Sequence, residues 1–155
     1  MAAEWFAIRT RAGAEDRVAI GIEAARMEAY LPVELVRVGT RGNRCQPNAV
    51  MWRPVFPGHV LAMFDPGRDL SRLCSLQGVD GVLKRDGKLV PVAEGTIAAL
   101  KSAERRGLFD LSRDCRLAVA EDEPPPDAAL VRRIKSSRGS KSRTAVLMAI
   151  LMCKT

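Results

Sequence analysis

Apolar residues follow two different spacings along the N-terminal part of the chain. Residues 5–10 and 59–64 are short apolar runs that contain aromatic and β-branched side chains, as strands do. Elsewhere apolar residues recur at every third or fourth position, which predicts amphipathic helices. The predicted inward faces of these helices are Val18, Ile22, Ala25 and Ala29; Leu70, Leu73 and Cys74; and Ile97 and Leu100.

Turn signals divide the rest of this region into further strands. Residues 28–38 are rich in strand formers and lead into a polar loop, 39–52, which is expected to be a hairpin tip. Residues 79–84 and 89–92 flank a second hairpin turn, and residues 94–106 have the pattern of a last helix. The resulting order predicts an α+β fold, a ferredoxin-like split βαβ sandwich with helices packed on one sheet.

The composition changes after residue 108. Residues 109–128 are acidic and contain the run Pro124 to Pro126, which is typical of a stiff, extended linker. Beyond it, residues 129–134 and 144–151 are two β-like segments joined by a basic stretch. We therefore expect a domain over residues 1–108, a linker over 109–128 and a small β-rich tail over 129–155.

The net charge of +7 is concentrated in this tail. Residues 1–127 hold 18 basic and 18 acidic side chains, whereas residues 128–155 hold seven basic side chains and no acid. Such a tail can contact nucleic acid or ribosomal RNA, or it can be a solvated end of the chain. No apolar run approaches the ~20 residues that cross a bilayer, and no signal peptide is recognised. We expect a cytoplasmic protein, a monomer, with no membrane contact.

The residues that carry chemistry in enzymes and metal sites are sparse. The four cysteines are far apart and His59 is the only histidine, so neither a zinc site nor a redox motif is predicted. No nucleophile–base set or phosphate-binding glycine loop occurs, which argues against an enzyme. We expect no cofactor, no metal and free thiols, with Cys74 in the core.

The stretch at 53–64 carries the most specific information. Pro54 and Pro57 forbid a helix and hold the backbone extended, and Gly58 allows a sharp turn before the following strand. Phe56 is thus held rigidly at the start of a strand. It is either a core residue or an exposed anchor for a partner, since large aromatics are typical interface hot spots.

Three short motifs, in their order and spacing, give the chain a family resemblance. They are Trp5-Phe6 with Arg9 and Gly13 behind it, Phe56-Pro57-Gly58, and Gly78-Val79-Asp80-Gly81-Val82. Together they resemble the N-terminal domain of NusG-type transcription elongation and antitermination factors, over about residues 5–108. The resemblance implies the same ferredoxin-like architecture. It also implies a factor that binds RNA polymerase and modulates pausing and termination without catalysing a reaction.

The resemblance further implies which residues contact the transcription machinery. Those implied to bind the clamp helices of RNA polymerase are Trp5, Phe56, Pro57, His59, Ile97 and Leu100. Ser71 and Arg72 match the side that faces the polymerase gate loop. Those implied to reach DNA, chiefly the non-template strand of the transcription bubble, are Arg9, Arg11, Gln77, Arg41 and Arg44. The alternative for each is structural: packing for the apolar residues and His59, solvation for the arginines.

The C-terminal region departs from this family. NusG proteins carry a C-terminal KOW barrel, whereas the tail here resembles only a shortened or degenerate KOW remnant. The tail is expected to be mobile or to pack on its own N-terminal domain through Val146, Leu147, Ile150 and Leu151. Two other hypotheses stay open. One is that the chain is an RNA-binding module that acts through its basic tail, and the other is that it is a specialised regulator that occupies the clamp site. Separately, the tail is an alternative contact site for a ribosomal or termination factor.

Overall fold

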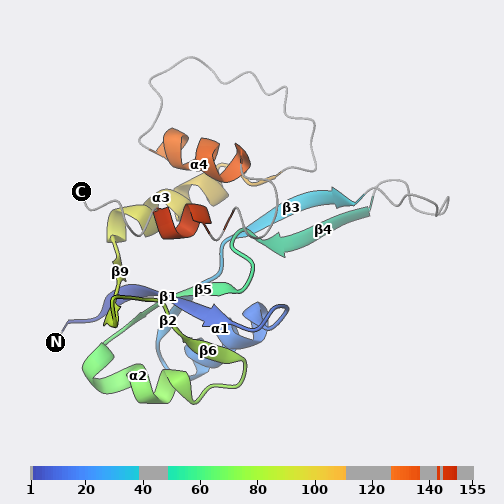
Figure 1. The fold of residues 1–155 in the computed structure, drawn as a ribbon. Helices are drawn as coiled ribbons and strands as arrows, with labels where there is room; N and C mark the ends of the chain where they lie inside the picture. Colours follow the sequence, from blue (N-terminus) through green and yellow to red (C-terminus); the bar gives the residue numbers. More distant parts are fainter. Residues whose placement is uncertain (1, 39–48, 111–126, 137–142, 144, 150–155) are drawn as a thin grey trace.

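Strand β1 lies at the centre of the main sheet and pairs antiparallel with its neighbours on both sides. The computed structural model describes residues 2–38, 49–110, 127–136, 143 and 145–149. The strand order is β2-β5-β1-β6, and β9 pairs with the first half of β1 (Figure 1). The bounds of these strands are β1 Glu4–Thr10, β2 Glu28–Tyr30, β5 His59–Phe64, β6 Val79–Val82 and β9 Pro91–Val92.

One face of this sheet is covered by two helices, α1 (Glu15–Ala24) and α2 (Pro66–Cys74). Successive side chains of a strand point to opposite faces, and Phe6 and Ile8 of β1 point to this side. They join a buried cluster with residues of both helices and of β5, including Val18, Ile22, Val60, Ala62, Phe64 and Leu73. The predicted inward faces of the first two helices are therefore confirmed for Val18, Ile22 and Leu73, which are buried. Ala25 is also buried but follows the end of α1, and Ala29, expected on the same helix, lies in β2.

The opposite face is covered by α3 (Glu94–Arg105) and by α4 (Asp127–Ser136). Trp5 and Ala7 of β1 point to this side. They belong to a second buried cluster with residues of β5, α3 and the C-terminal region, including Leu61, Ile97, Leu100, Ala103, Ile134 and Leu147. Figure 1 shows the two helical layers on either side of the sheet.

A glycine turn joins the hairpin region to the main sheet. Gly58 has a φ of +77°, a conformation that side chains with a Cβ adopt only with strain. Its carbonyl accepts a hydrogen bond of 2.8 Å from the Thr10 amide. Its own amide donates to Oε1 of Glu15, at 2.7 Å, at the start of α1. The turn is therefore tied to both β1 and α1.

A separate two-stranded sheet projects from the body of the molecule. It consists of β3 (Val33–Val38) and β4 (Ala49–Pro54), paired from Val33 opposite Pro54 to Val38 opposite Ala49 (Figure 1). The single strand region expected at 28–38 is thus divided in two at Pro32, which has no amide hydrogen to continue the ladder. A second small hairpin, β7 (Lys84–Arg85) with β8 (Lys88–Leu89), turns at Asp86 and Gly87 as expected.

The α+β class is confirmed, but the structure corrects three expectations. The tail, expected to be β-rich, is helical in α4 and over residues 145–149, because its apolar residues pack at helical spacing against α3 and the sheet. Cys74 is exposed rather than in the core. Phe109, expected at the start of the linker, is buried in the second cluster. Within the expected linker, residues 111–126 lie outside the described residues, and Asp127, expected inside it, already begins α4.

The Gly58 turn generates a prediction with a matched control. Replacing Gly58 with Ala should lower the free energy of unfolding by about 1–2 kcal/mol, because an L side chain is strained at this φ. The same change at Gly95, where a Cβ meets open space within α3, should leave stability unchanged or raise it by up to about 1 kcal/mol. Urea unfolding of both variants measures the difference. Equal changes in the free energy of unfolding for the two variants would show that the positive φ of Gly58 does not cause the loss of stability.

Candidate functional site

Phe56 lies in the turn that carries the chain from β4 into β5. The turn is fixed at both ends, since the Val55 amide donates to the Pro32 carbonyl at 2.8 Å and the His59 amide donates to the Phe56 carbonyl at 3.1 Å. The Phe56 ring is 1% exposed. In this arrangement Phe56 is therefore a buried residue, and the exposed anchor considered from the sequence is not exposed.

The residues around Phe56 are the ones that the sequence singled out separately. Trp5 from β1, and Ile97 and Leu100 from α3, lie in the same buried cluster as Phe56. These four of the six residues implied to bind the polymerase clamp thus come together from three distant parts of the chain. We call this set the Phe56 face.

The C-terminal region completes the cover of the Phe56 face. Ile134 of α4 and Leu147 are each 1% exposed and belong to the same cluster, with Leu130 and Val146 packed against it. α4 also packs on α3 (Figure 1). Packing through Val146 and Leu147 was expected from the sequence and is observed. Ile150 and Leu151 lie outside the described residues.

A buried ion pair fastens the tail beside this face. The Arg143 guanidinium donates to the Glu34 carboxylate and, at 3.4 Å, to the Val55 carbonyl oxygen. The side chains of Arg143 and Glu34 are only 6% and 2% exposed. Arg53, opposite Glu34 on β4, pairs with the same carboxylate but is half exposed. Sequence reasoning missed this contact, and the one local signal was an acid at an inward position of a strand.

A cation and two rings form the rim of the Phe56 face. Lys101 Nζ lies 5.0 Å from the centroid of the Trp5 ring and 5.4 Å from that of Tyr30, within the range of cation–π attraction. It also pairs with Glu28 at 2.9 Å. The Tyr30 hydroxyl donates to Oε2 of Glu104 at 3.0 Å. These contacts bind α3 to β2 and hold the rim in one arrangement.

Pro57 and His59, the two remaining residues implied at the clamp site, lie close to Phe56 in the chain but differ from it in burial or polarity. Pro57 is half-buried, and His59 is 7% exposed, so the imidazole does not present a free surface here. Burial lowers the pKa of His59, while the Pro57 carbonyl oxygen, 3.2 Å from Nδ1, acts in the opposite direction. A neutral, packed ring is the consequence.

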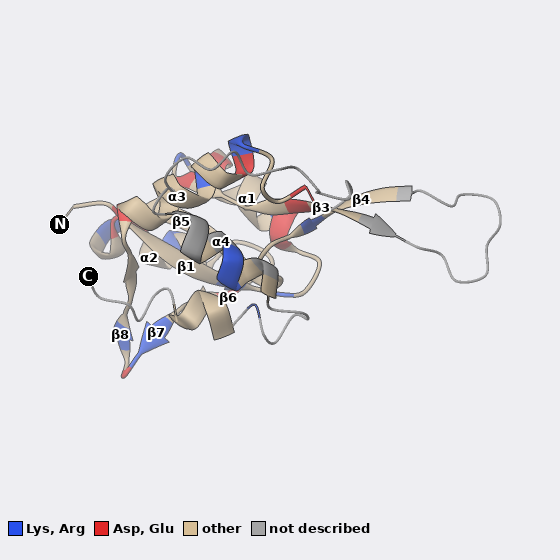
Figure 2. Ribbon diagram, turned by 90° about the horizontal axis from the view of Figure 1, so that it is seen from above, with Lys and Arg blue, Asp and Glu red and all other residues tan. Residues whose placement is uncertain are grey.

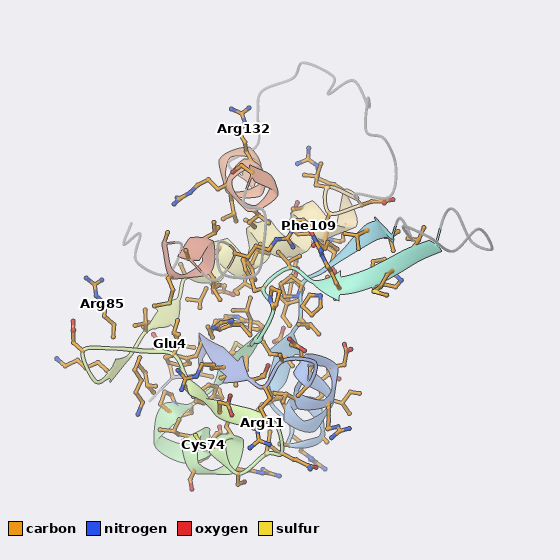
Figure 3. All side chains as sticks on the ribbon, turned by 45° about the vertical axis from the view of Figure 1, so that its right-hand side comes forward. Glu4, Arg11, Cys74, Arg85, Phe109 and Arg132 are labelled. Atoms are coloured by element: carbon orange, nitrogen blue, oxygen red, sulfur yellow. The ribbon has the colours of Figure 1, made fainter. Side chains whose placement is uncertain are left out.

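The described residues implied to face DNA or the gate loop lie on the surface, and Arg9 is directly opposite His59 in the β1–β5 pairing. Arg9, Arg11, Ser71, Arg72 and Gln77 are all exposed. The Arg11 amide donates to the Gly78 carbonyl at 3.0 Å, which places the end of β1 beside the residues that follow α2. The Arg11 side chain is 80% exposed and only 3.7 Å from Asp80 (Figure 3). Arg41 and Arg44 lie outside the described residues.

The described residues show neither a metal-ion cluster nor a membrane-crossing helix. No group of three or more His, Cys, Asp or Glu among them is placed to hold a metal ion. None of the described helices is long and apolar enough to cross a membrane.

Comparisons with known proteins identify the relatives of the chain. The family model described as "Transcription termination factor nusG" matches residues 3–101. Among solved structures, a study of domain interaction in Thermotoga maritima NusG provides a similar chain. It is 22% identical, with a TM-score of 0.40, over 63% of this chain and 55% of that one. The chain thus spans just over half the length of that structure. A search of curated proteins finds no match.

The buried ion pair predicts how firmly the tail is held. Arg143→Met removes the buried partner of the Glu34 carboxylate and leaves Arg53 in place, so undocking of the tail should become easier by about 1.5–3 kcal/mol. Arg53→Met removes a half-exposed partner of the same carboxylate and should cost under about 1 kcal/mol. Hydrogen exchange of the α4 amides measures both effects. Equal protection in the two variants would contradict a fastening role for Arg143.

Proposed function

The chain belongs to the NusG family of transcription factors, and on that basis we propose that it is an elongation and antitermination factor that binds the RNA polymerase clamp helices through its Phe56 face. The observation that carries the proposal is the convergence of Trp5, Phe56, Ile97 and Leu100 in one apolar cluster. Apolar clusters centred on aromatics are typical of interface hot spots. The antiparallel order β2-β5-β1-β6, with helices in two crossovers, supports the ferredoxin-like split βαβ interpretation.

In this proposal the tail and the polymerase compete for the same face. The Phe56 face is available to the clamp only when α4 and residues 145–149 leave it. The apparent affinity is then reduced by the fraction of molecules in which the tail is undocked. The factor is therefore held in a low-affinity arrangement until a partner or a change at Glu34 and Arg143 favours undocking.

The exposed residues implied to face DNA or the gate loop supply the second contact. Arg9 and Arg11 would touch phosphates of the non-template strand, and Ser71 and Arg72 the gate-loop side of the polymerase. Phosphate contacts by arginine give affinity without reading sequence. A ligand that touches both sides of the polymerase cleft favours its closed, pause-resistant state by a population shift. No bond is made or broken, so the role is regulatory.

One observation favours the alternative, an RNA-binding module that acts through the tail. Arg132 and Arg133 are exposed on α4, where Figure 2 shows basic residues, and Arg132 points away from the body of the molecule (Figure 3). They are available to phosphate while the tail is docked. The alternative predicts RNA binding that depends on Arg132 and not on Phe56.

Polymerase binding tests the Phe56 face. Arg143→Met should increase retention of core polymerase, because the tail leaves the face more readily. Adding Phe56→Leu should weaken that retention by about 1 kcal/mol or more, roughly fivefold, through loss of the ring. The matched control is Phe64→Leu, since Phe64 is 2% exposed in the cluster on the opposite face of the sheet. If Phe64→Leu weakens retention as much, general destabilisation accounts for the loss and the docking face is wrong.

Cross-linking tests the DNA contact. Arg11→Ala should reduce cross-linking of the factor to the non-template strand of an elongation complex and lower the salt dependence by about one charge. The control is Arg132→Ala at the opposite end of the molecule, which should change neither. Unchanged cross-linking in the Arg11 variant at every salt concentration would remove Arg11 from the site. A loss confined to the Arg132 variant would favour the RNA-binding alternative.

A further inference from the structure

The tail shows what a ligand of the Phe56 face must supply, because it is the segment that covers this face. Its buried side chains are of two kinds. Ile134 and Leu147 are apolar and fill the cluster around Phe56. Arg143 is a cation and is also buried. The apolar pair and the arginine therefore meet two separate requirements of the surface beneath them.

The requirement that Arg143 meets is set by two oxygen acceptors beside the Phe56 ring. One is the carboxylate of Glu34 on β3, which is 2% exposed. The other is the carbonyl oxygen of Val55, the residue before Phe56. The Arg143 guanidinium donates to both of them. A guanidinium carries five donors in a fixed fork, so one side chain can serve two neighbouring oxygens.

Arg53 shares the Glu34 carboxylate but leaves the requirement in place. Its side chain is 49% exposed, whereas the side chain of Arg143 is 6% exposed. Arg143 is thus the partner on the side that the tail covers. A ligand that covered this side without a donor would leave the carboxylate and the Val55 carbonyl short of a hydrogen bond in a buried place, and such a loss weakens binding.

The cation and one of the apolar groups are presented together. Arg143 and residues 145–149 are helical. Positions four apart lie on the same side of a helix, as Arg143 and Leu147 do. The pattern that fits the Phe56 face is therefore a guanidinium at the acceptors and an aliphatic side chain, one helical turn later, in the cluster.

We propose that the polymerase segment that docks on the Phe56 face presents this same pattern, an arginine one helical turn before an aliphatic residue, and that its arginine takes the place of Arg143 at Glu34. The inference rests on the proposed function for the identity of the partner. It goes further in naming the chemistry of the contact. Glu34 then has two roles, since it fastens the tail and also selects a basic helix over one that is apolar throughout.

The test needs a chain whose tail stays off the Phe56 face whatever residue stands at position 34. Ile134→Asp combined with Leu147→Asp provides it, because docking would bury two carboxylates in an apolar cluster. Loss of hydrogen-exchange protection at the α4 amides verifies that the tail is released in every variant. Retention of core polymerase is then measured on this released chain.

On the released chain, Glu34→Leu should weaken retention of core polymerase about tenfold or more, because a hydrogen bond to a charged group is lost. Glu34→Gln keeps an acceptor but removes the charge, so its loss should be smaller than that of Glu34→Leu but measurable. It is also nearly isosteric and serves if Glu34→Leu fails to fold. The matched control is Asp69→Asn, which neutralises a buried acid of α2 and should leave retention unchanged.

The direction of the change separates a basic partner from an apolar one. A wholly apolar partner would bind Glu34→Leu more tightly, because no buried charge would then lose its water. Retention by Glu34→Leu equal to or above that of the released chain would therefore overturn the inference. Full retention by Glu34→Gln would overturn it too, since a neutral donor would then suffice.

Phe56→Leu on the same released chain shows which proposal has failed. If it weakens retention while the Glu34 variants do not, the docking face stands and the arginine contact alone is wrong. If Phe56→Leu leaves retention unchanged, the docking face itself is wrong, and the contact at Glu34 is rejected with it.

Discussion

The fold depends on a central strand that is apolar on both faces. Trp5 and Ala7 of β1 point to one side of the sheet, and Phe6 and Ile8 point to the other. The larger of these side chains each gain about 1.5–3 kcal/mol or more from full burial, so both faces need a cover. Helices α1 and α2 cover one face. On the other, Ile134 and Leu147 of the tail share the buried cluster with α3.

This constraint links the tail to the proposed function. An apolar face that the sheet presents must be covered by something; in the structure the tail covers it, and under the proposed function the polymerase would take its place. The ion pair between Glu34 and Arg143 forms only when the tail is docked, so it favours the arrangement in which the tail covers the face. A buried pair adds little net stability compared with apolar packing, but it is costly to break and so fixes one arrangement. It therefore sets the register of the tail on the face more than the strength of the contact.

Local patterns predicted the strands and helices of the main sheet well, because each depends on neighbouring residues. The Gly58 turn and helix α3 are examples. The four residues that converge at the Phe56 face were selected by the family resemblance. The sequence could not decide that Phe56 is buried, since the cover comes from residues more than seventy positions later. The pair of Glu34 with Arg143 spans 109 positions. Trp52 was assigned to a polar loop, because strand β4 begins inside the stretch read as a hairpin tip.

The error in the tail has a physical cause that bears on its behaviour. Ile134 and Val146 are β-branched, and such residues favour strands. Their intrinsic preferences amount to tenths of a kcal/mol each and are overridden by packing.

Helix α4 has only 10 residues, and isolated helices below about 12–15 residues are marginal in water. The helical form of the tail is therefore maintained by the Phe56 face on which it packs. A partner that takes this face removes both the contacts of the tail and the reason for its helical backbone, so undocking and loss of helix are coupled events.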